Sequence, residues 1–181
     1  MERAQVVSLV AEAQAGSAIA FARLARRWDR RLVAHAWRLL GDGDAAREAA
    51  QSAWVEMARG LKRLREPAAF PAWAYRITTR QAAAIIRRRQ GERRLQGALE
   101  QAAITEPQVT VQPEPTADDA LHAAIRALPP DQRAAIALHH FEGLSVAETA
   151  VALDAPVGTI KTRLMHARLK LRAALEGDTH D

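Results

Sequence analysis

The strongest regularity in this chain of 181 residues is the recurrence of apolar residues at helical spacing. In segment 21–40, FARLARRWDRRLVAHAWRLL, they fall at steps of three and four and form one continuous face. The residues of this face are Phe21, Leu24, Trp28, Leu32, Ala36 and Leu39. The apolar residues are mainly Ala and Leu, aromatic residues make up 4% of the chain, and long runs of β-branched residues are absent. These features predict an all-α protein.

Residues 1–95 read as one helical domain in which short breaks separate the helices. GDGD interrupts the chain, and Asp44 is expected to cap the helix that follows it. The residues of this helix that should face inward are Ala46, Ala50, Ala53, Trp54, Met57 and Leu61. REPAAFP breaks the chain again, because proline ends a helix, and a third helix is expected from Ala72 to about Gln90. Its apolar side should contain Trp73, Ile77, Ala82, Ile85 and Ile86.

Residues 96–117 differ in composition from both flanking regions and are expected to form a flexible linker. They are acidic rather than basic, and prolines 107, 113 and 115 exclude a helix there. Residues 118–181 then form a second small helical domain, which begins with helices in DDALHAAIRAL and DQRAAIALHHF. Gly143 follows as a C-cap.

The second domain ends in a helix-turn-helix pattern. SVAETAVAL opens with a capping box of Ser145 and Glu148, and the four-residue turn DAPV leads into GTIKTRLMHARLKLRAAL. In this last helix, the residues expected to pack on the domain are Ile160, Leu164, Ala167, Leu171 and Leu175. The residues expected to contact DNA from the other side are Thr159, Lys161, Thr162, Arg163, Met165, His166 and Lys170. Residues 157–175 contain five basic residues and no acidic one.

The positive charge is concentrated in the first domain. Residues 1–95 hold 19 Lys and Arg against 9 Asp and Glu, a net charge of +10, whereas residues 96–127 carry −4 and residues 128–181 carry −1. Arg76, Arg80 and Arg87 form a stripe with Ala83 on the polar side of the third helix. Because guanidinium groups pair well with phosphates, this stripe is a second candidate DNA contact. Two basic helices, one in each domain, favour a protein that holds DNA at two places.

Several function classes find no support in the sequence. It has no Cys, its six His are scattered, and no helix face brings His and carboxylates to ligand spacing, so we expect no metal site and no cofactor. Paired carboxylates, a nucleophile–base set and a phosphate-binding glycine loop are not visible, so we expect no enzyme. Neither a signal peptide nor an apolar stretch of membrane-spanning length is present, and we therefore expect a cytoplasmic protein that does not enter a membrane.

Over nearly its whole length the chain resembles the extracytoplasmic-function, or group 4, sigma factors of bacterial RNA polymerase. The similarity is strongest in LPPDQRAAIALHHFEGLSVAETAVALDAPVGTIKTRLMHARLKLR. It extends to AFARLARRW, AREAAQSAWVEM and FPAWAYRITTRQAAAIIRRR in the first domain. The resemblance implies an alternative sigma factor whose first domain docks on the clamp helices of the polymerase β′ subunit and captures the −10 promoter element. The second domain would bind the −35 element, and an anti-sigma factor would regulate the protein.

The resemblance also assigns roles to residues. Those implied to face the polymerase are Glu48, Gln51, Ser52 and Val55. Segment 64–71 and the start of the next helix correspond to the part that captures a flipped base, and Lys161, Thr162, Met165 and His166 to the −35 reading positions. The chain departs from the family pattern at Arg47, Arg80, Ala84, Thr149 and Asp154. Arg47 and Arg80 leave open a sigma-like protein without initiation activity, and a helix-turn-helix regulator of the response-regulator type is a second alternative.

Overall fold

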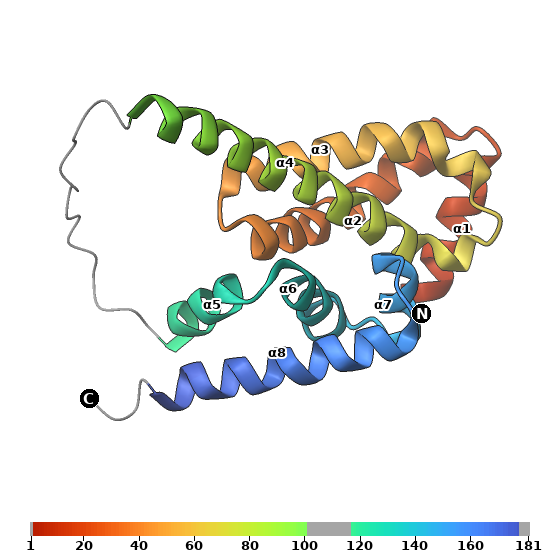
Figure 1. Cartoon of the computed structure of the whole chain (residues 1–181). Helices are drawn as coiled ribbons and strands as arrows, with labels where there is room; N and C mark the ends of the chain where they lie inside the picture. Colours follow the sequence, from red (N-terminus) through yellow and green to blue (C-terminus); the bar gives the residue numbers. More distant parts are fainter. Residues whose placement is uncertain (1, 101–116, 178–181) are drawn as a thin grey trace.

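The computed structural model describes residues 2–100 and 117–177 of the chain, and these residues form helices and short connections without a strand. The N-terminal group contains α1 (Glu2–Gln14), α2 (Ala18–Leu40), α3 (Gly43–Gly60), η1 (Leu61–Arg63), η2 (Pro67–Ala69) and α4 (Phe70–Glu100). The C-terminal group contains α5 (Ala117–Ala127), α6 (Pro130–Ile136), η3 (Ala137–Phe141), α7 (Val146–Leu153) and α8 (Val157–Gly177). The expected all-α fold with two helical regions is confirmed (Figure 1).

The core of the N-terminal group follows the periodicity of the sequence. Along α2, Leu24, Trp28 and Leu32 are almost completely buried, and Phe21 packs at the edge. Ala46, Ala50, Ala53, Met57 and Leu61 are likewise buried, with Trp54 half-buried. Small alanines let α2, α3 and α4 approach closely, while Trp28 lies edge-on against Phe70 at 5.2 Å between ring centroids.

Two boundaries in this group differ from those expected. The cap of α3 is Asp42 rather than Asp44, because the Asp42 carboxylate accepts a hydrogen bond from the Ala45 amide at 2.9 Å. Helix α4 starts at Phe70 and continues to Glu100, ten residues beyond the expected end. The single Gly91 does not interrupt it, since one glycine costs only about 1 kcal/mol and helix-forming residues follow. Most of the expected linker, residues 101–116, lies outside the described residues.

The C-terminal group has the expected helix-turn-helix. The capping box of Ser145 and Glu148 is formed at the start of α7, and Asp154 adopts a left-handed conformation with φ of 50° in the turn. Thr149 is fully buried, but its hydroxyl donates to the Ser145 carbonyl at 2.9 Å. Ile160, Leu164 and Ala167 are buried as expected, whereas Leu175 remains 37% exposed. Leu175 lies near the free end of α8, where it lines a shallow apolar groove with Leu121 and Leu171.

The helix before this motif ends in a wide turn. After α6 the chain continues as the π-helical segment η3, and the Glu142 amide donates to the carbonyl of Ala137 at 3.2 Å. Gly143 follows with φ of 71°, a conformation that suits glycine. Together the wide turn and Gly143 direct Glu142 toward the N-terminal group.

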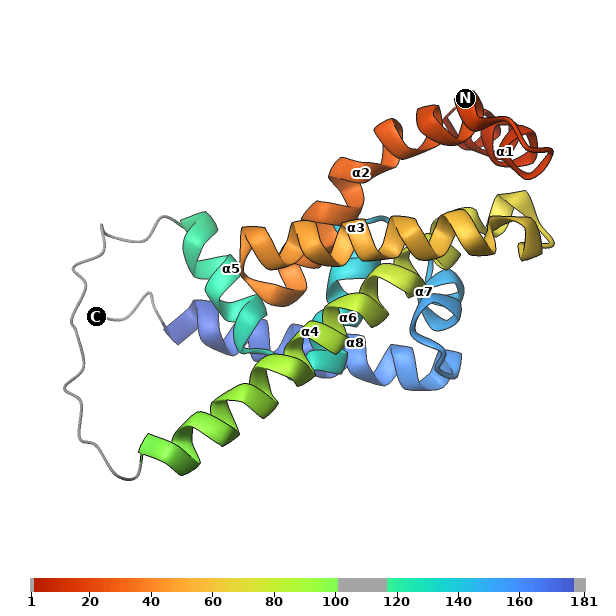
Figure 2. The same ribbon diagram turned by 90° about the horizontal axis from the view of Figure 1, so that it is seen from above.

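The two groups pack against each other. Helices α5 and α6 lie against α2 and helix α7 packs on α4, while α8 lies on the far side of α5 and α6 (Figures 1 and 2). Leu138, Leu144 and Ala152 belong to the same buried cluster as Trp28 and Tyr75. A second cluster joins alanines 134 and 137 to Leu39, Ala82 and other residues of the N-terminal group. The regions that the sequence separates by a linker therefore share their apolar core.

Candidate nucleic-acid interface

The outer face of α8 is the first candidate surface. Lys161, Thr162, Met165, His166 and Lys170 are exposed there, and Thr159 and Arg163 are half-buried at its margin. Ile160 and Leu164 hold the helix on the domain through their buried side chains, so the opposite side faces solvent. Arg163 forms an ion pair with Asp131 of α6 at 2.6 Å, which fixes the start of α8. The structure thus brings five of the seven α8 candidates to one exposed side, while Thr159 lies at the margin and Arg163 is turned toward α6.

The arginine stripe of α4 is the second candidate surface, and it has different neighbours. Arg76 forms an ion pair at 3.0 Å with Asp154, which belongs to the C-terminal group. Arg80 pairs with Glu56 of α3, and Arg87 is exposed further along the helix. The arginines therefore lie on one side of α4 as expected, but two of them already contact carboxylates.

A cavity of about 430 Å³ lies between the arginine stripe and the C-terminal group. From α4 it is lined by Arg76, Arg80 and Ala83, and from the other side by Arg133, Asp154 and Arg163 among others. Four arginines line the cavity, and each of them already bonds to a carboxylate or a carbonyl group; two of the carboxylates, Asp131 and Asp154, line the cavity as well. Residues assigned by sequence to two separate DNA contacts meet around this one cavity.

The outer face of α3 presents the four residues implied to bind polymerase. Glu48, Gln51, Ser52 and Val55 are all exposed and follow one another at steps of three, one and three. Glu48 accepts two hydrogen bonds from Arg88 of α4, at 2.9 and 3.1 Å. These bonds lower the pKa of Glu48 below its ordinary value. Val55, the one branched apolar residue among the four, is 47% exposed.

Glu142 is the main polar contact between the two groups. Its carboxylate accepts a hydrogen bond from the Tyr75 hydroxyl at 2.5 Å and pairs with Arg38 at 2.7 Å. The Glu142 side chain is only 6% exposed, and its burial raises its pKa above the ordinary value although Tyr75 and Arg38 act in the opposite direction. The Arg38 guanidinium also lies 4.5 Å from the ring centroid of Phe141.

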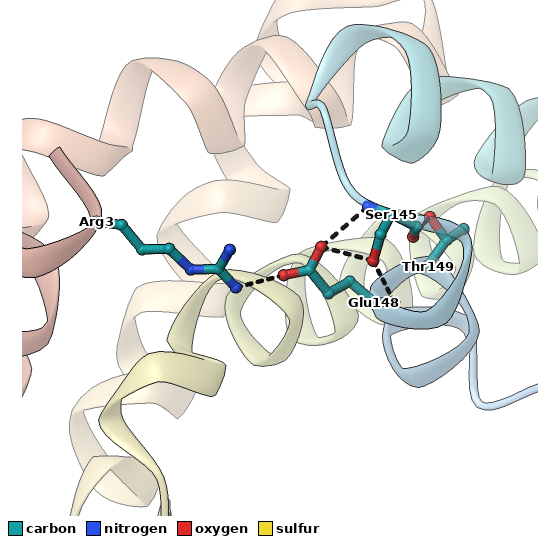
Figure 3. A network of polar contacts seen from close by, with 4 residues as sticks. All are labelled: Arg3, Ser145, Glu148 and Thr149. Carbon is teal, nitrogen blue, oxygen red and sulfur yellow. Dashed lines mark hydrogen bonds and ion pairs between the residues drawn. The ribbon is translucent and has the colours of Figure 1, made fainter.

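A smaller polar network joins α1 to the start of α7 (Figure 3). Arg3 reaches across and donates to Glu148 at 2.6 Å, while the other carboxylate oxygen of Glu148 accepts from the Ser145 amide at 2.9 Å. The bonds from Ser145 lower the pKa of Glu148, and Arg3 adds to this effect. The capping box that starts the helix-turn-helix is therefore also a contact between the two groups.

Sequence reasoning missed the carboxylates that pair with the arginine stripe and the buried Glu142. The stripe itself follows from local spacing, whereas its partners Glu56 and Asp154 lie 24 and 78 positions away in the chain. The one available signal was Tyr75, a polar aromatic residue on a helix whose apolar side is buried, because a buried tyrosine hydroxyl needs a partner.

Residues 2–100 and 117–177, which the structure describes, lack two features. No cluster of three or more His, Asp and Glu side chains suited to a metal ion occurs among them. None of their helices has the length and hydropathy required to cross a membrane.

Comparison with known proteins places this geometry in a class. The family model for sigma-70 region 2 matches residues 24–92, and the model for sigma-70 region 4 matches residues 118–171. A chain with these two regions is a sigma factor of the sigma-70 class, and such proteins are DNA-recognition subunits rather than catalysts.

Individual relatives narrow the class. The chain is 29% identical to the RNA polymerase sigma-H factor of Pseudomonas aeruginosa over 178 residues, covering 93% of this chain and 92% of the relative. It is 30% identical to the ECF RNA polymerase sigma-E factor of Escherichia coli K12 over 174 residues, covering 88% of each. The chain belongs to the extracytoplasmic-function (ECF) sigma factors and is an alternative sigma factor that directs transcription initiation.

A solved structure shares the fold. CnrH in complex with the cytosolic domain of CnrY superposes with a TM-score of 0.72 at 24% identity, covering 96% of this chain and 99% of that chain. The region-2 and region-4 matches also remove the response-regulator alternative, because the first half of the chain is a sigma region rather than a receiver domain.

Proposed function

We propose that three surfaces of this sigma factor divide the recognition of polymerase and promoter. The exposed face of α3 binds the clamp helices of the β′ subunit of core RNA polymerase. The arginine stripe of α4 contacts the melted −10 element, and the outer face of α8 reads the −35 element as duplex. The protein itself performs no reaction and acts in the cytoplasm, where polymerase and DNA are.

The observation that carries this proposal is the outer face of α8. Buried Ile160 and Leu164 hold the helix on its domain, so that Lys161, Thr162 and Met165 project into solvent near its N-terminal end. A helix held in this way can enter a major groove with its first turns against the base edges. Lys170, one to two turns further on, lies where a phosphate would be contacted.

An anti-sigma partner belongs to the same proposal. CnrH was solved with the cytosolic domain of CnrY, and a further neighbour, the sigma factor RpoE of Bartonella quintana, was solved with the anti-sigma factor NepR.

The polymerase contact can be tested by capture of core RNA polymerase on the immobilised full-length chain. Val55→Glu places a charge at the proposed contact and should reduce capture about tenfold or more, because an unpaired charge in an interface is costly. Val151→Glu is the matched control, since it introduces the same charge at another exposed valine, which lies on α7 and is 57% exposed, and should leave capture unchanged.

The wild-type result separates the remaining alternatives. Run-off transcription with added core polymerase on a promoter library should give discrete products. Capture of polymerase without transcription would instead support a sigma-like protein that has lost initiation activity. Failure of the wild type to bind polymerase would overturn the assignment of α3.

A further inference from the structure

The outer face of α8 has a line of uncharged, mostly apolar residues along its middle. Its members follow one another at steps of four, three and four and therefore share one side of the helix: Gly158, Thr162, Met165 and Leu169. All four are exposed, Met165 at 51% and Leu169 at 60%. The line faces away from α5 and α6, on which α8 packs, and is therefore open to a partner outside the molecule (Figure 1).

Cationic side chains flank this line on both sides. At about 100° per residue, Lys161 and Arg168 lie on one flank of the line and Lys170 on the other. All three are exposed. A helix with an apolar middle and cationic margins suits the major groove of DNA, where base edges lie between two phosphate backbones. The margins can contact phosphates while the middle of the helix meets the bases.

Thr162 presents little hydrogen-bonding capacity to such a partner. Its hydroxyl donates to the Gly158 carbonyl at 3.1 Å, a bond back to the preceding turn that threonine often makes within a helix. A hydroxyl has one hydrogen to donate, so Thr162 can offer a partner only an acceptor and its γ-methyl group. Met165 adds a thioether, which is a weak acceptor on an otherwise apolar side chain. The middle of the face is therefore better suited to apolar than to polar groups.

Thymine is the base that presents an apolar group in the major groove. Its 5-methyl group lies there beside the O4 acceptor, whereas the other three bases are distinguished there by hydrogen-bond donors and acceptors. A methionine side chain is flexible and polarizable, so it can adjust to the position of a methyl group. The chemistry of the apolar line thus matches one base.

We propose that Met165, assisted by the γ-methyl group of Thr162, selects thymine in the −35 element by contact with its 5-methyl group. The inference rests on the proposed function in taking α8 as the helix that reads the −35 element. Removing one methyl-sized group from water corresponds to about a fourfold gain in affinity. Leu169, one turn further along α8, continues the same apolar line.

The preference for thymine can be measured by selection from a randomised pool of duplex DNA. Core RNA polymerase with the full-length chain should enrich thymine at one or more −35 positions. Met165→Gln keeps the length of the side chain but makes it polar, so enrichment of thymine should be lost at one of these positions. Met165→Leu remains apolar and should keep it. A −35 element without enriched thymine, or equal enrichment by wild type and Met165→Gln, would overturn the proposal.

Deoxyuridine then isolates the methyl group, because uracil is thymine without this group and keeps the same hydrogen-bonding edge. In a selected duplex, uracil in place of the enriched thymine should lower the affinity of the wild-type holoenzyme about fourfold. The affinity of the Met165→Gln holoenzyme should not change, so that the two substitutions form a cycle that measures the contact itself. Uracil at a thymine between the two promoter elements is the matched control. Equal wild-type affinities for both duplexes would refute the methyl contact.

Failure of this inference is distinguishable from failure of the proposed function. A holoenzyme that selects a discrete −35 element but does not respond to the methyl group refutes the role of Met165 alone. A chain that binds core polymerase but enriches no −35 element refutes the assignment of α8 as a reading helix. Because Met165 is exposed, its substitutions should leave the helical circular dichroism unchanged.

Discussion

The two basic helices, α4 and α8, carry similar sets of arginine and lysine in different surroundings. On α4, four arginines pair with carboxylates outside that helix: Arg76 with Asp154, Arg80 with Glu56, Arg88 with Glu48 and Arg89 with Asp42. On α8, the residues at the proposed base-reading positions are exposed. The comparison shows that basic composition identifies a helix that can bind DNA, whereas carboxylates from distant parts of the chain decide which of its arginines are already paired.

The largest expected effect is the response of the N-terminal group to acid. In this group His35 is completely buried where α2 meets α4. The Nε2 of His35 lies 2.8 Å from the Thr79 hydroxyl, and its ring centroid lies 5.1 Å from that of Tyr75. Its Nδ1 has no hydrogen-bond partner among the described residues. Burial, with a smaller effect of Arg38, lowers the pKa of His35 from 6.5 to about 3. The folded protein therefore keeps this ring neutral where the unfolded chain protonates it.

It follows that the free energy of unfolding falls as the pH decreases from 6.5 towards 3, by about 1.4 kcal/mol per pH unit from His35 alone. Urea unfolding at several pH values should show a smaller loss for His35→Gln, while His166→Gln on the exposed face of α8 should behave as the wild type. Glu142 has the opposite effect on stability, because its raised pKa favours the folded state at low pH. The contribution of His35 is therefore measured as the difference between the pH dependence of His35→Gln and that of the wild type. Equal slopes for wild type and His35→Gln would contradict this assignment.

The next effect concerns reading of the promoter by α8. Lys161→Ala should cost about 1–3 kcal/mol if Lys161 contacts a base, and the loss should depend only on the sequence of the −35 element. The measurement is open-complex formation on promoters varied separately in each element.

Arg80→Ala is the matching change on α4. It should slow promoter opening on all sequences and leave the −35 preference unchanged, because a long cation there contacts the backbone of the melted strand rather than one base. A −35 effect of Arg80→Ala, or a −10 effect of Lys161→Ala, would mean that the domains are assigned to the wrong promoter elements.

The smallest effect is expected at the ion pair that joins the two sides. The side chains of Arg76 and Asp154 are 45% and 78% exposed, so their pairing contributes at most about 1 kcal/mol. Asp154→Asn preserves the left-handed turn and should lower the free energy of unfolding in urea slightly. The difference from wild type should vanish in 1 M salt, where such pairs are screened. A difference that persists in 1 M salt would show that Asp154 acts through the turn rather than through charge.

Local features of the fold could be predicted from the sequence. The buried faces of α2 and α8 follow from apolar spacing, and the capping box at Ser145 follows from two residues three positions apart. The predicted cap of α3 was wrong because GDGD offers two aspartates that could each cap a helix, Asp42 and Asp44. Only the geometry of the turn selects Asp42. Leu175 has the right spacing to be buried, but helical periodicity does not tell where the neighbouring helix ends.

Contacts between the domains were beyond sequence reasoning. The ion pair of Arg38 and Glu142 joins residues 104 positions apart, and that of Arg3 and Glu148 joins residues 145 positions apart. Each side chain alone resembles an ordinary solvated charge, and only the packing of α6 and α7 on α2 and α4 brings them together. The assignments of individual site residues on α3, α4 and α8 stay predictions that the variants above can test.

The bond from Arg133 to the Leu39 carbonyl has a mechanical consequence. Carbonyl groups in the last turn of a helix lack partners within that helix, so the final turn of α2 is completed by a side chain from α6. If the domains separate, this turn loses its partner and should fray. Separation of the domains would then be detected as faster amide hydrogen exchange near residues 37–41. The stability of the last turn of α2 thus depends on whether α6 of the other domain is in contact with it.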